Sequence, residues 1–80
     1  PRMQHCNKRL VLIRTLEAIE RAEVRGSTEA YVCLTCYGVP NIMLSQVKKD
    51  LDDAIPEGWY TEWGKDRGTL ILRSKNAQVS

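Results

Sequence analysis

The chain has 80 residues, a formal charge of +2 and an apolar fraction of 42%. These values are ordinary for one small globular domain and exclude an intrinsically disordered chain. No apolar run approaches the roughly 20 residues that span a bilayer, and the stretch LVLI is too short for a signal peptide. We therefore expect one intracellular domain over residues 1–80, with flexible ends at 1–6 and 75–80 and no membrane partner.

Charge is distributed unevenly along the chain. Residues 1–25 hold six Lys or Arg against three Glu, residues 26–58 hold two against five acids, and residues 59–80 hold four against two. Both ends are therefore basic and the middle is acidic. Most proteins that bind duplex DNA concentrate positive charge on the contacting element, so the acidic middle argues against DNA binding there.

The first predicted element is an amphipathic helix over residues 8–25. Asn7 is a suitable N-cap residue, and Gly26 suits the left-handed position after a helix. Glu17 and Arg21 are spaced for a favourable i,i+4 ion pair. The apolar positions recur at helical spacing and are Leu12, Ile13, Leu16 and Ile19.

The next segment, residues 28–37, has two interpretations. Its run AYVCLTCY alternates with strand periodicity and is rich in β-forming residues. Ser27, Thr28 and Glu29 instead resemble a helix start, with a capping hydroxyl followed by an acid in the first turn. The sequence leaves strand and helix both open for this segment.

A second helix is predicted over residues 40–54, after Gly38 ends the preceding segment. Pro40 suits the first helical position, because its missing amide hydrogen would have no partner there. The positions expected to be buried are Leu44, Val47 and Leu51. The opposite face carries Asn41, Ile42, Ser45, Gln46 and Lys49, with Lys48 at its flank.

The last predicted element is a β-hairpin over residues 59–73. The runs GWYTEW and TLILRS favour strands, and the glycines of the turn GKDRG accommodate positive φ angles. Alternation places Trp59, Thr61 and Trp63 on one face of the first strand, and it places Leu70 and Leu72 together on the second.

The stretch GVPNIMLSQVKKDL, followed by this hairpin, resembles the winged helix-turn-helix family over residues 8–75. In that family a Gly-Val pair, four variable residues, an apolar residue and Ser lead through the turn into the recognition helix. The chain departs from the family at Leu34, where Ala is usual. If residues 28–37 are helical, the resemblance implies an α+β, winged-helix-like domain. If they are extended, we expect α-β-α-β-β, with two helices on a three-stranded sheet and without groove-insertion geometry.

The resemblance implies a DNA-binding transcriptional regulator, with helix 40–54 as the recognition helix and hairpin 59–73 as the wing. Its partner would be double-stranded DNA, and we expect a homodimer because one such module buries little DNA surface. The implied contacts come from the helix and the wing tip and are Asn41, Ile42, Ser45, Gln46, Lys48, Lys49, Lys65 and Arg67. Additional contacts to the DNA backbone would come from Arg2, Lys8 and Arg9.

Two other functions are alternatives to DNA binding. A protein-docking module or inhibitor would use exposed apolar and aromatic side chains, for which the candidates are Ile42, Met43, Tyr60 and Trp63. An enzyme would need a placed catalytic set. The single histidine lies near the N-terminus, and no catalytic triad, phosphate loop or pocketed carboxylate pair is evident, so we predict no enzymatic activity.

The cysteines raise the question of a metal site. The motif CLTC and its upstream neighbours supply the residue types of a Cys₃His zinc site, namely His5, Cys6, Cys33 and Cys36. A single C-x-x-C is a weak signal, and on a strand its cysteines would point to opposite faces. We therefore predict no metal or other cofactor and interpret the cysteines as small buried apolar groups. A thioredoxin-like role lacks its usual strand–motif–helix context, and three cysteines, an odd number, fit a reducing compartment.

Overall fold

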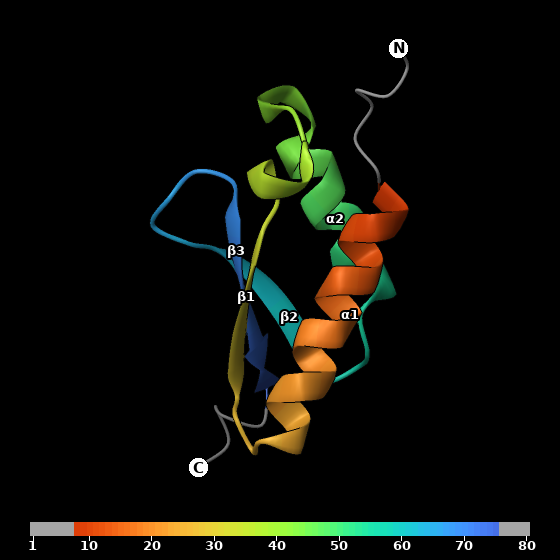
Figure 1. Cartoon of the computed structure of the whole chain (residues 1–80), viewed down its shortest axis with the longest axis vertical. Coiled ribbons are helices and arrows are strands. Elements are labelled where there is room, and N and C mark those ends of the chain that lie inside the picture. The colour runs from red at the N-terminus through yellow and green to blue at the C-terminus, as the bar shows by residue number, and fades with distance from the viewer. Residues whose placement is uncertain (1–7, 76–80) are drawn as a thin grey trace.

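The structure is a computed structural model and describes residues 8–75. Its two helices and three-stranded antiparallel sheet confirm a small α+β domain (Figure 1). The elements in chain order are α1 (Lys8–Val24), β1 (Glu29–Cys33), the 3-10 turns η2 (Thr35–Tyr37) and η3 (Asn41–Met43), α2 (Leu44–Ala54), β2 (Trp59–Trp63) and β3 (Thr69–Ser74).

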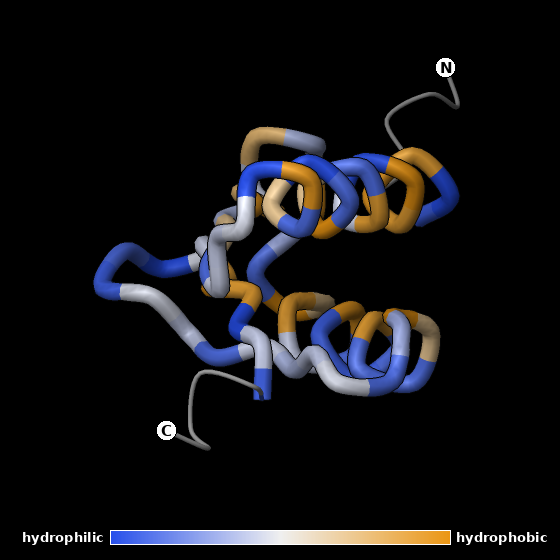
Figure 2. Tube along the Cα trace, turned by 90° about the horizontal axis from the view of Figure 1, so that it is seen from below, coloured by the Kyte–Doolittle hydropathy of each residue, from blue (hydrophilic) through white to orange (hydrophobic). Residues whose placement is uncertain are grey.

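The molecule has a layer of helices and a layer of sheet. The strands are ordered β1-β3-β2, so β3 lies between the other two. Figure 1 shows both helices on one side of the sheet, and Figure 2 shows them side by side, with the hairpin turn extending away from them. Neither helix within residues 8–75 is long and apolar enough to cross a membrane.

The helix predicted over residues 8–25 is confirmed as α1, and it ends where the glycine indicated. Gly26 has a φ of +74°. The Ser27 amide donates to the Ala22 carbonyl at 2.7 Å, and the Gly26 amide donates to the Glu23 carbonyl at 3.1 Å. These two bonds form a Schellman motif, which satisfies carbonyls that the helix end would otherwise leave unpaired. The predicted N-cap, Asn7, lies outside the described residues.

The buried face of α1 differs from the predicted one. Thr15 belongs to it, because its hydroxyl donates to the Val11 carbonyl at 2.7 Å and so leaves no buried polar atom unpaired. Ile13, predicted beside the apolar face, is 45% exposed. Leu12 and Leu16 pack only at the edge of the core, whereas the fully buried positions are Val11, Thr15, Ile19 and Ala22.

Surface charges on α1 also pair differently from the prediction. The Arg14 guanidinium donates to Glu17 at 2.9 Å, so the observed partner of Glu17 lies three residues before it and not at Arg21. Both side chains are more than two-fifths exposed, so this pair contributes little to stability.

The disputed segment contains both predicted structures in succession. Residues 29–33 form β1, and residues 35–37 then form the single helical turn η2. Leu34 joins them and is fully buried, and its amide still donates to the Gly68 carbonyl at 2.7 Å. The α-β-α-β-β alternative therefore describes the chain, with one helical turn added before Gly38.

The inner face of the sheet supplies the centre of the core. Leu70 and Leu72 of β3 are fully buried, with Val32 and Trp59 beside them on the flanking strands. The Trp59 indole nitrogen donates to Glu23 of α1 at 3.0 Å, which ties β2 to the helix layer. The hairpin predicted over residues 59–73 is thus confirmed with its expected inward-facing leucines.

The outer face of the sheet is organised around Arg73. This residue lies between Glu29 and Tyr60 in the strand register. Its guanidinium bonds Glu62 at 2.6 Å and Glu29 at 2.9 Å. The side-chain hydrogen bond to Glu62 raises the pKa of Arg73 further above its already high ordinary value. The outer face therefore carries a cross-strand ion network in which the charge of Arg73 is paired with two glutamates.

Candidate nucleic-acid interface

The turn into α2 positions the candidate surface. Gly38 has a φ of +83°, and its amide donates to the Thr35 carbonyl at 3.1 Å. The Val39 amide donates to the Leu34 carbonyl at 3.2 Å, which completes a second Schellman motif. The Val39 side chain is 3% exposed. The predicted roles of Gly38 at the turn and Val39 in the core are both confirmed.

The helix that follows divides into a buried face and an exposed face. Its buried positions are the predicted Leu44, Val47 and Leu51, none more than 5% exposed. The α-helix begins at Leu44, four residues later than predicted, because Pro40 keeps an extended ψ of 153° and residues 41–43 form the 3-10 turn η3, in which the Pro40 carbonyl accepts the Met43 amide at 2.9 Å. The helix ends at Ala54, as predicted.

The opposite face holds most of the predicted contact residues, and it faces solvent. The exposed residues are Asn41, Ile42, Ser45, Gln46 and Lys49. Ile42 is 92% exposed, an unusual position for a large apolar side chain. We expected the groove-insertion geometry to disappear if residues 28–37 were extended and paired into a sheet. Residues 29–33 are extended and paired with β3, but β1 ends at Cys33, and the helix face after the Gly38 turn is still exposed.

The lysines and the glutamine of this helix differ in their partners. Lys48 is half-buried, and its ammonium pairs with Asp52 at 3.1 Å. Gln46 donates one amide hydrogen to Asp50 at 2.9 Å. No ion pair within residues 8–75 involves Lys49. The two lysines thus differ: Lys49 is available to bind an anion, whereas the charge of Lys48 is already paired with that of Asp52.

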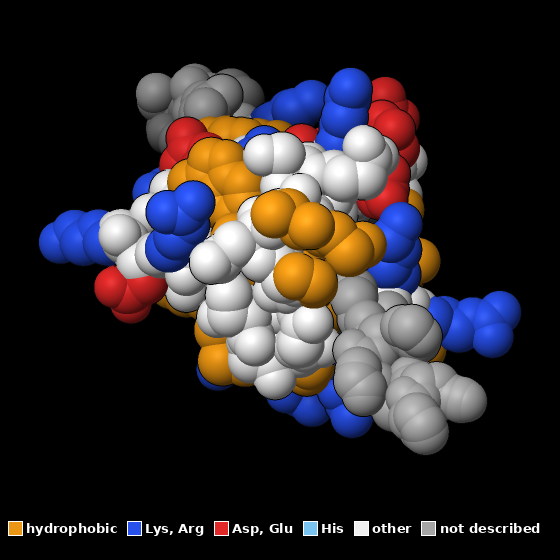
Figure 3. Space-filling view, turned by 90° about the horizontal axis from the view of Figure 1, so that it is seen from above, with side chains coloured by type: hydrophobic (Ala, Val, Ile, Leu, Met, Phe, Trp, Pro, Cys, Tyr) orange, Lys and Arg blue, Asp and Glu red, His pale blue; other side chains and the backbone are white. Residues whose placement is uncertain are grey.

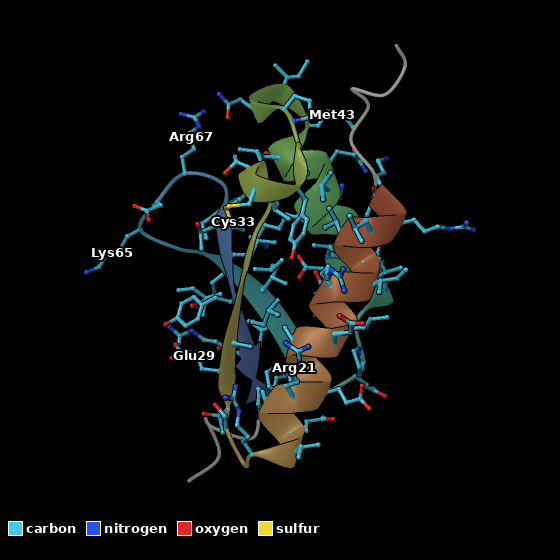
Figure 4. The ribbon with its side chains drawn as sticks, viewed as in Figure 1. Arg21, Glu29, Cys33, Met43, Lys65 and Arg67 are labelled. Atoms are coloured by element: carbon cyan, nitrogen blue, oxygen red, sulfur yellow. A yellow bond between two sulfur atoms is a disulfide. The ribbon has the colours of Figure 1, made fainter. Side chains whose placement is uncertain are left out.

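The hairpin turn, residues 64–68, brings two further cations to the same end of the molecule (Figure 4). Lys65 and Arg67 are exposed and form no ion pair with any residue from 8 to 75. The Gly64 amide donates to the Thr69 carbonyl at 2.8 Å and so closes the turn. The predicted positive φ occurs at Gly68, where it is +89°, but not at Gly64.

A shallow hollow of about 380 Å³ joins the helix to the turn. Its helix side is formed by Asn41, Leu44 and Ser45. Its sheet side is formed by Trp63, which is 44% exposed, and by residues 64–68. The exposed start of α2 and the hairpin turn, which carries Lys65, Asp66 and Arg67, therefore line the same hollow.

The acidic residues of α2 follow its contact residues in the chain and are largely paired, with Asp50 also bonded to Gln46 of the contact face. Residues 41–49 contain no acid. Asp50 accepts from Lys8 at 3.5 Å, and Asp52 pairs with Lys48. Figure 3, the view onto this end, shows apolar side chains at the centre with Lys and Arg side chains, and some Asp and Glu side chains, around them. The charge distribution that argued against DNA binding in the sequence is thus less unfavourable in the folded chain.

The metal candidates are only partly described. Cys33 and Cys36 form a disulfide, and no group of three or more His, Cys, Asp or Glu among residues 8–75 could hold a metal ion. The interpretation of these cysteines as buried apolar groups is wrong, since Cys36 is exposed and Cys33 half-buried. The chain leaves the strand after Cys33, and η2 brings Cys36 back beside it. His5 and Cys6 lie outside the described residues, as does Arg2.

Sequence reasoning missed one residue pair that supports the surface. Gly68 is buried, and a Cβ atom there would collide with the Thr35 side chain of η2. The base of the hairpin turn therefore rests against the turn that precedes α2. In the sequence, the second glycine of GKDRG indicated a turn, but nothing indicated that this turn would contact Thr35.

Comparison with known proteins adds no homologue. No protein-family model matches the chain, no curated protein is similar to it, and no solved structure resembles it.

Proposed function

We propose that the chain binds double-stranded DNA as a transcriptional regulator, with α2 used as the recognition helix and the hairpin as the wing, although a strand and one 3-10 turn replace the first helix of a helix-turn-helix motif. Residues 41–49 would enter the major groove, and the hairpin turn 64–68 would contact the adjacent backbone. The observation that carries the proposal is the surface around the 380 Å³ hollow. Its lining combines polar residues of the helix face with the turn residues Lys65, Asp66 and Arg67. Lys65 and Arg67 have no ion-pair partner in residues 8–75, and neither does Lys49, which is exposed on the same helix face.

The side chains on the helix face suit base edges in the major groove. Gln46 keeps one amide hydrogen and its carbonyl oxygen available after bonding Asp50, which is what bidentate pairing with adenine needs. Asn41 has the same capacity. The exposed Ile42 suits the methyl group of thymine, and Ser45 can donate to or accept from either base type.

The cations suit phosphates and predict a salt-dependent affinity. Each phosphate neutralised on B-DNA contributes about −0.9 to the slope of log affinity against log salt. Fluorescence anisotropy with a random duplex, at several salt concentrations, measures this slope. Removing two phosphate contacts in Lys65→Ala/Arg67→Ala should make the slope shallower by about 1.8.

A matched control removes the same charge elsewhere. Arg21 is exposed on the last turn of α1, far from the hairpin turn (Figure 4), and Arg25 is exposed directly after the end of this helix. Arg21→Ala/Arg25→Ala should leave most of the slope intact. Absence of salt-dependent binding by the unaltered chain, or equal effects of the two double variants, would contradict the proposal.

A protein-docking function is the second candidate, and one observation favours it. Ile42, at 92%, and Trp63, at 44%, expose apolar surface at the same end of the molecule, and exposed apolar surface is typical of docking sites. Ile42→Ser separates the two candidates. It should leave phosphate-driven binding to random duplex unchanged, whereas a protein partner seated on Ile42 would be lost.

A further inference from the structure

We propose that Cys33 and Cys36 form a reversible thiol–disulfide site, in which an incoming thiol attacks Cys36 and displaces Cys33. The inference does not rest on DNA binding, because it concerns a different group of atoms. It rests on the positions of the two sulfurs and on their unequal surroundings.

The disulfide is accessible at the surface of the molecule. Cys33 ends β1 and Cys36 lies in η2, with their Cα atoms 5.3 Å apart. Cys36 is exposed and Cys33 half-buried. Both line a hollow of about 480 Å³ between α1 and β1, whose other walls include Arg14, Tyr31 and Tyr37. A small thiol can therefore approach Cys36 from solvent, whereas Cys33 is more shielded.

The two sulfurs differ in their hydrogen bonds. The Cys36 amide donates to the Cys33 sulfur at 3.3 Å, and the Thr35 hydroxyl lies 3.3 Å from the same sulfur. No such bond within residues 8–75 reaches the Cys36 sulfur. A hydrogen bond to a sulfur becomes stronger as negative charge develops on that sulfur. The hydrogen bonds to the Cys33 sulfur therefore favour Cys33 as the leaving thiolate.

The exchange balances in two steps. The incoming thiolate bonds the Cys36 sulfur, the Cys33–Cys36 bond breaks, and its electron pair leaves with Cys33 as a thiolate. A second thiolate then attacks the incoming sulfur of this mixed disulfide and releases Cys36. The protein gains two electrons and, after protonation, two protons, while two small thiols are oxidised to one disulfide.

The direction of attack is tested with sulfite, a nucleophile that leaves a stable mark on the sulfur it attacks. The full chain carrying Cys6→Ser, so that only this pair remains, is oxidised, exposed briefly to sulfite and quenched with acid. Tandem mass spectrometry then locates the S-sulfonate. We expect roughly a tenfold preference for Cys36, as hydrogen bonds to a charged sulfur imply. Equal labelling, a preference for Cys33, or no labelling would overturn the proposal.

Two further measurements test its remaining parts. Thr35→Val removes the hydroxyl with little change of shape and should weaken the preference for Cys36, whereas Thr28→Val, an exposed control, should not. The chain with Cys6→Ser should also be reduced by excess glutathione and closed again by glutathione disulfide. A pair that fails to reduce, or that stays as two thiols in excess glutathione disulfide, would show that the site is not reversible and overturn the proposal.

Discussion

The contact between the hairpin turn and η2 makes a sharp prediction about stability. Gly68 combines a φ of +89° with a buried position in which a Cβ atom would collide with the Thr35 side chain. Replacing Gly68 with alanine therefore imposes two separate penalties, one from the backbone and one from the collision.

The size of each penalty follows from the geometry. A left-handed backbone costs a residue with a Cβ about 1 to 2 kcal/mol. Forcing an extra carbon into a filled site costs about 1 to 3 kcal/mol more. Gly68→Ala should therefore lower the free energy of unfolding by roughly 2 to 5 kcal/mol. That is a large share of the roughly 4 to 12 kcal/mol expected for a domain of this size.

Two comparisons separate the penalties. Gly26 has a similar φ of +74° but open space around its missing Cβ, so Gly26→Ala should carry the backbone penalty alone. Thr35→Ser removes the methyl group nearest to Gly68, so in the double variant it should remove most of the collision penalty. Urea unfolding followed by tryptophan fluorescence measures the free energy of each variant, together with Thr35→Ser alone as the reference.

The reasoning would be refuted by either of two results. In one, Gly68→Ala costs no more than Gly26→Ala. In the other, Thr35→Ser leaves the cost of Gly68→Ala unchanged. Either result would mean that the base of the hairpin turn does not rest on η2 in solution, and the shared surface of turn and helix would lose its support.

Two further predictions concern the helix face and the core. Lys49→Ala should weaken duplex binding and make the slope of log affinity against log salt shallower by about 0.9. Lys48→Ala should change this slope less, because Lys48 is already paired with Asp52. Equal slopes for the two variants in the anisotropy titration would contradict this prediction. Leu70→Ala should lower the free energy of unfolding by about 2 to 5 kcal/mol, as urea titration would report, because its side chain is fully buried. Ile13→Ala should change it by only about 0.5 kcal/mol, and a larger loss would mean that Ile13 is buried in solution.

Local signals predicted those parts of the fold that depend on neighbours in the sequence. Gly26 and Gly38 marked two helical ends because each needs a positive φ, and both ends are Schellman motifs. The spacing of Leu44, Val47 and Leu51 identified the buried face of α2. The opposite side of the same helix was then predicted to be exposed. A regular period and a glycine are enough for such features, since each is defined within a few residues.

Other features depended on contacts that the sequence does not reveal. Thr15 lies in the core only because its hydroxyl bonds a backbone carbonyl of its own helix, and a hydrophobic period cannot include it. Residues 28–37 change from strand to helical turn at Leu34, where burial against the rest of the chain outweighs local preference. The disulfide follows from that change, because on a uniform strand Cys33 and Cys36 would point to opposite faces of the sheet.

The candidate surface was foreseen residue by residue but not as a shape. The exposed helix residues and the turn cations were proposed from a family resemblance. Their convergence around one hollow required the sheet to hold the hairpin turn beside the start of α2. Pairing also changed their expected contributions, since Lys48 is neutralised by Asp52 while Lys49 is not.

Backbone amide shifts in a titration with duplex DNA test the central claim most directly. The account predicts that the largest shifts map to residues 41–49 and 64–68, with little change along the outer face of the sheet. No shifts at moderate salt, or shifts centred on β1 and β3, would contradict the claim that this end of the molecule binds DNA.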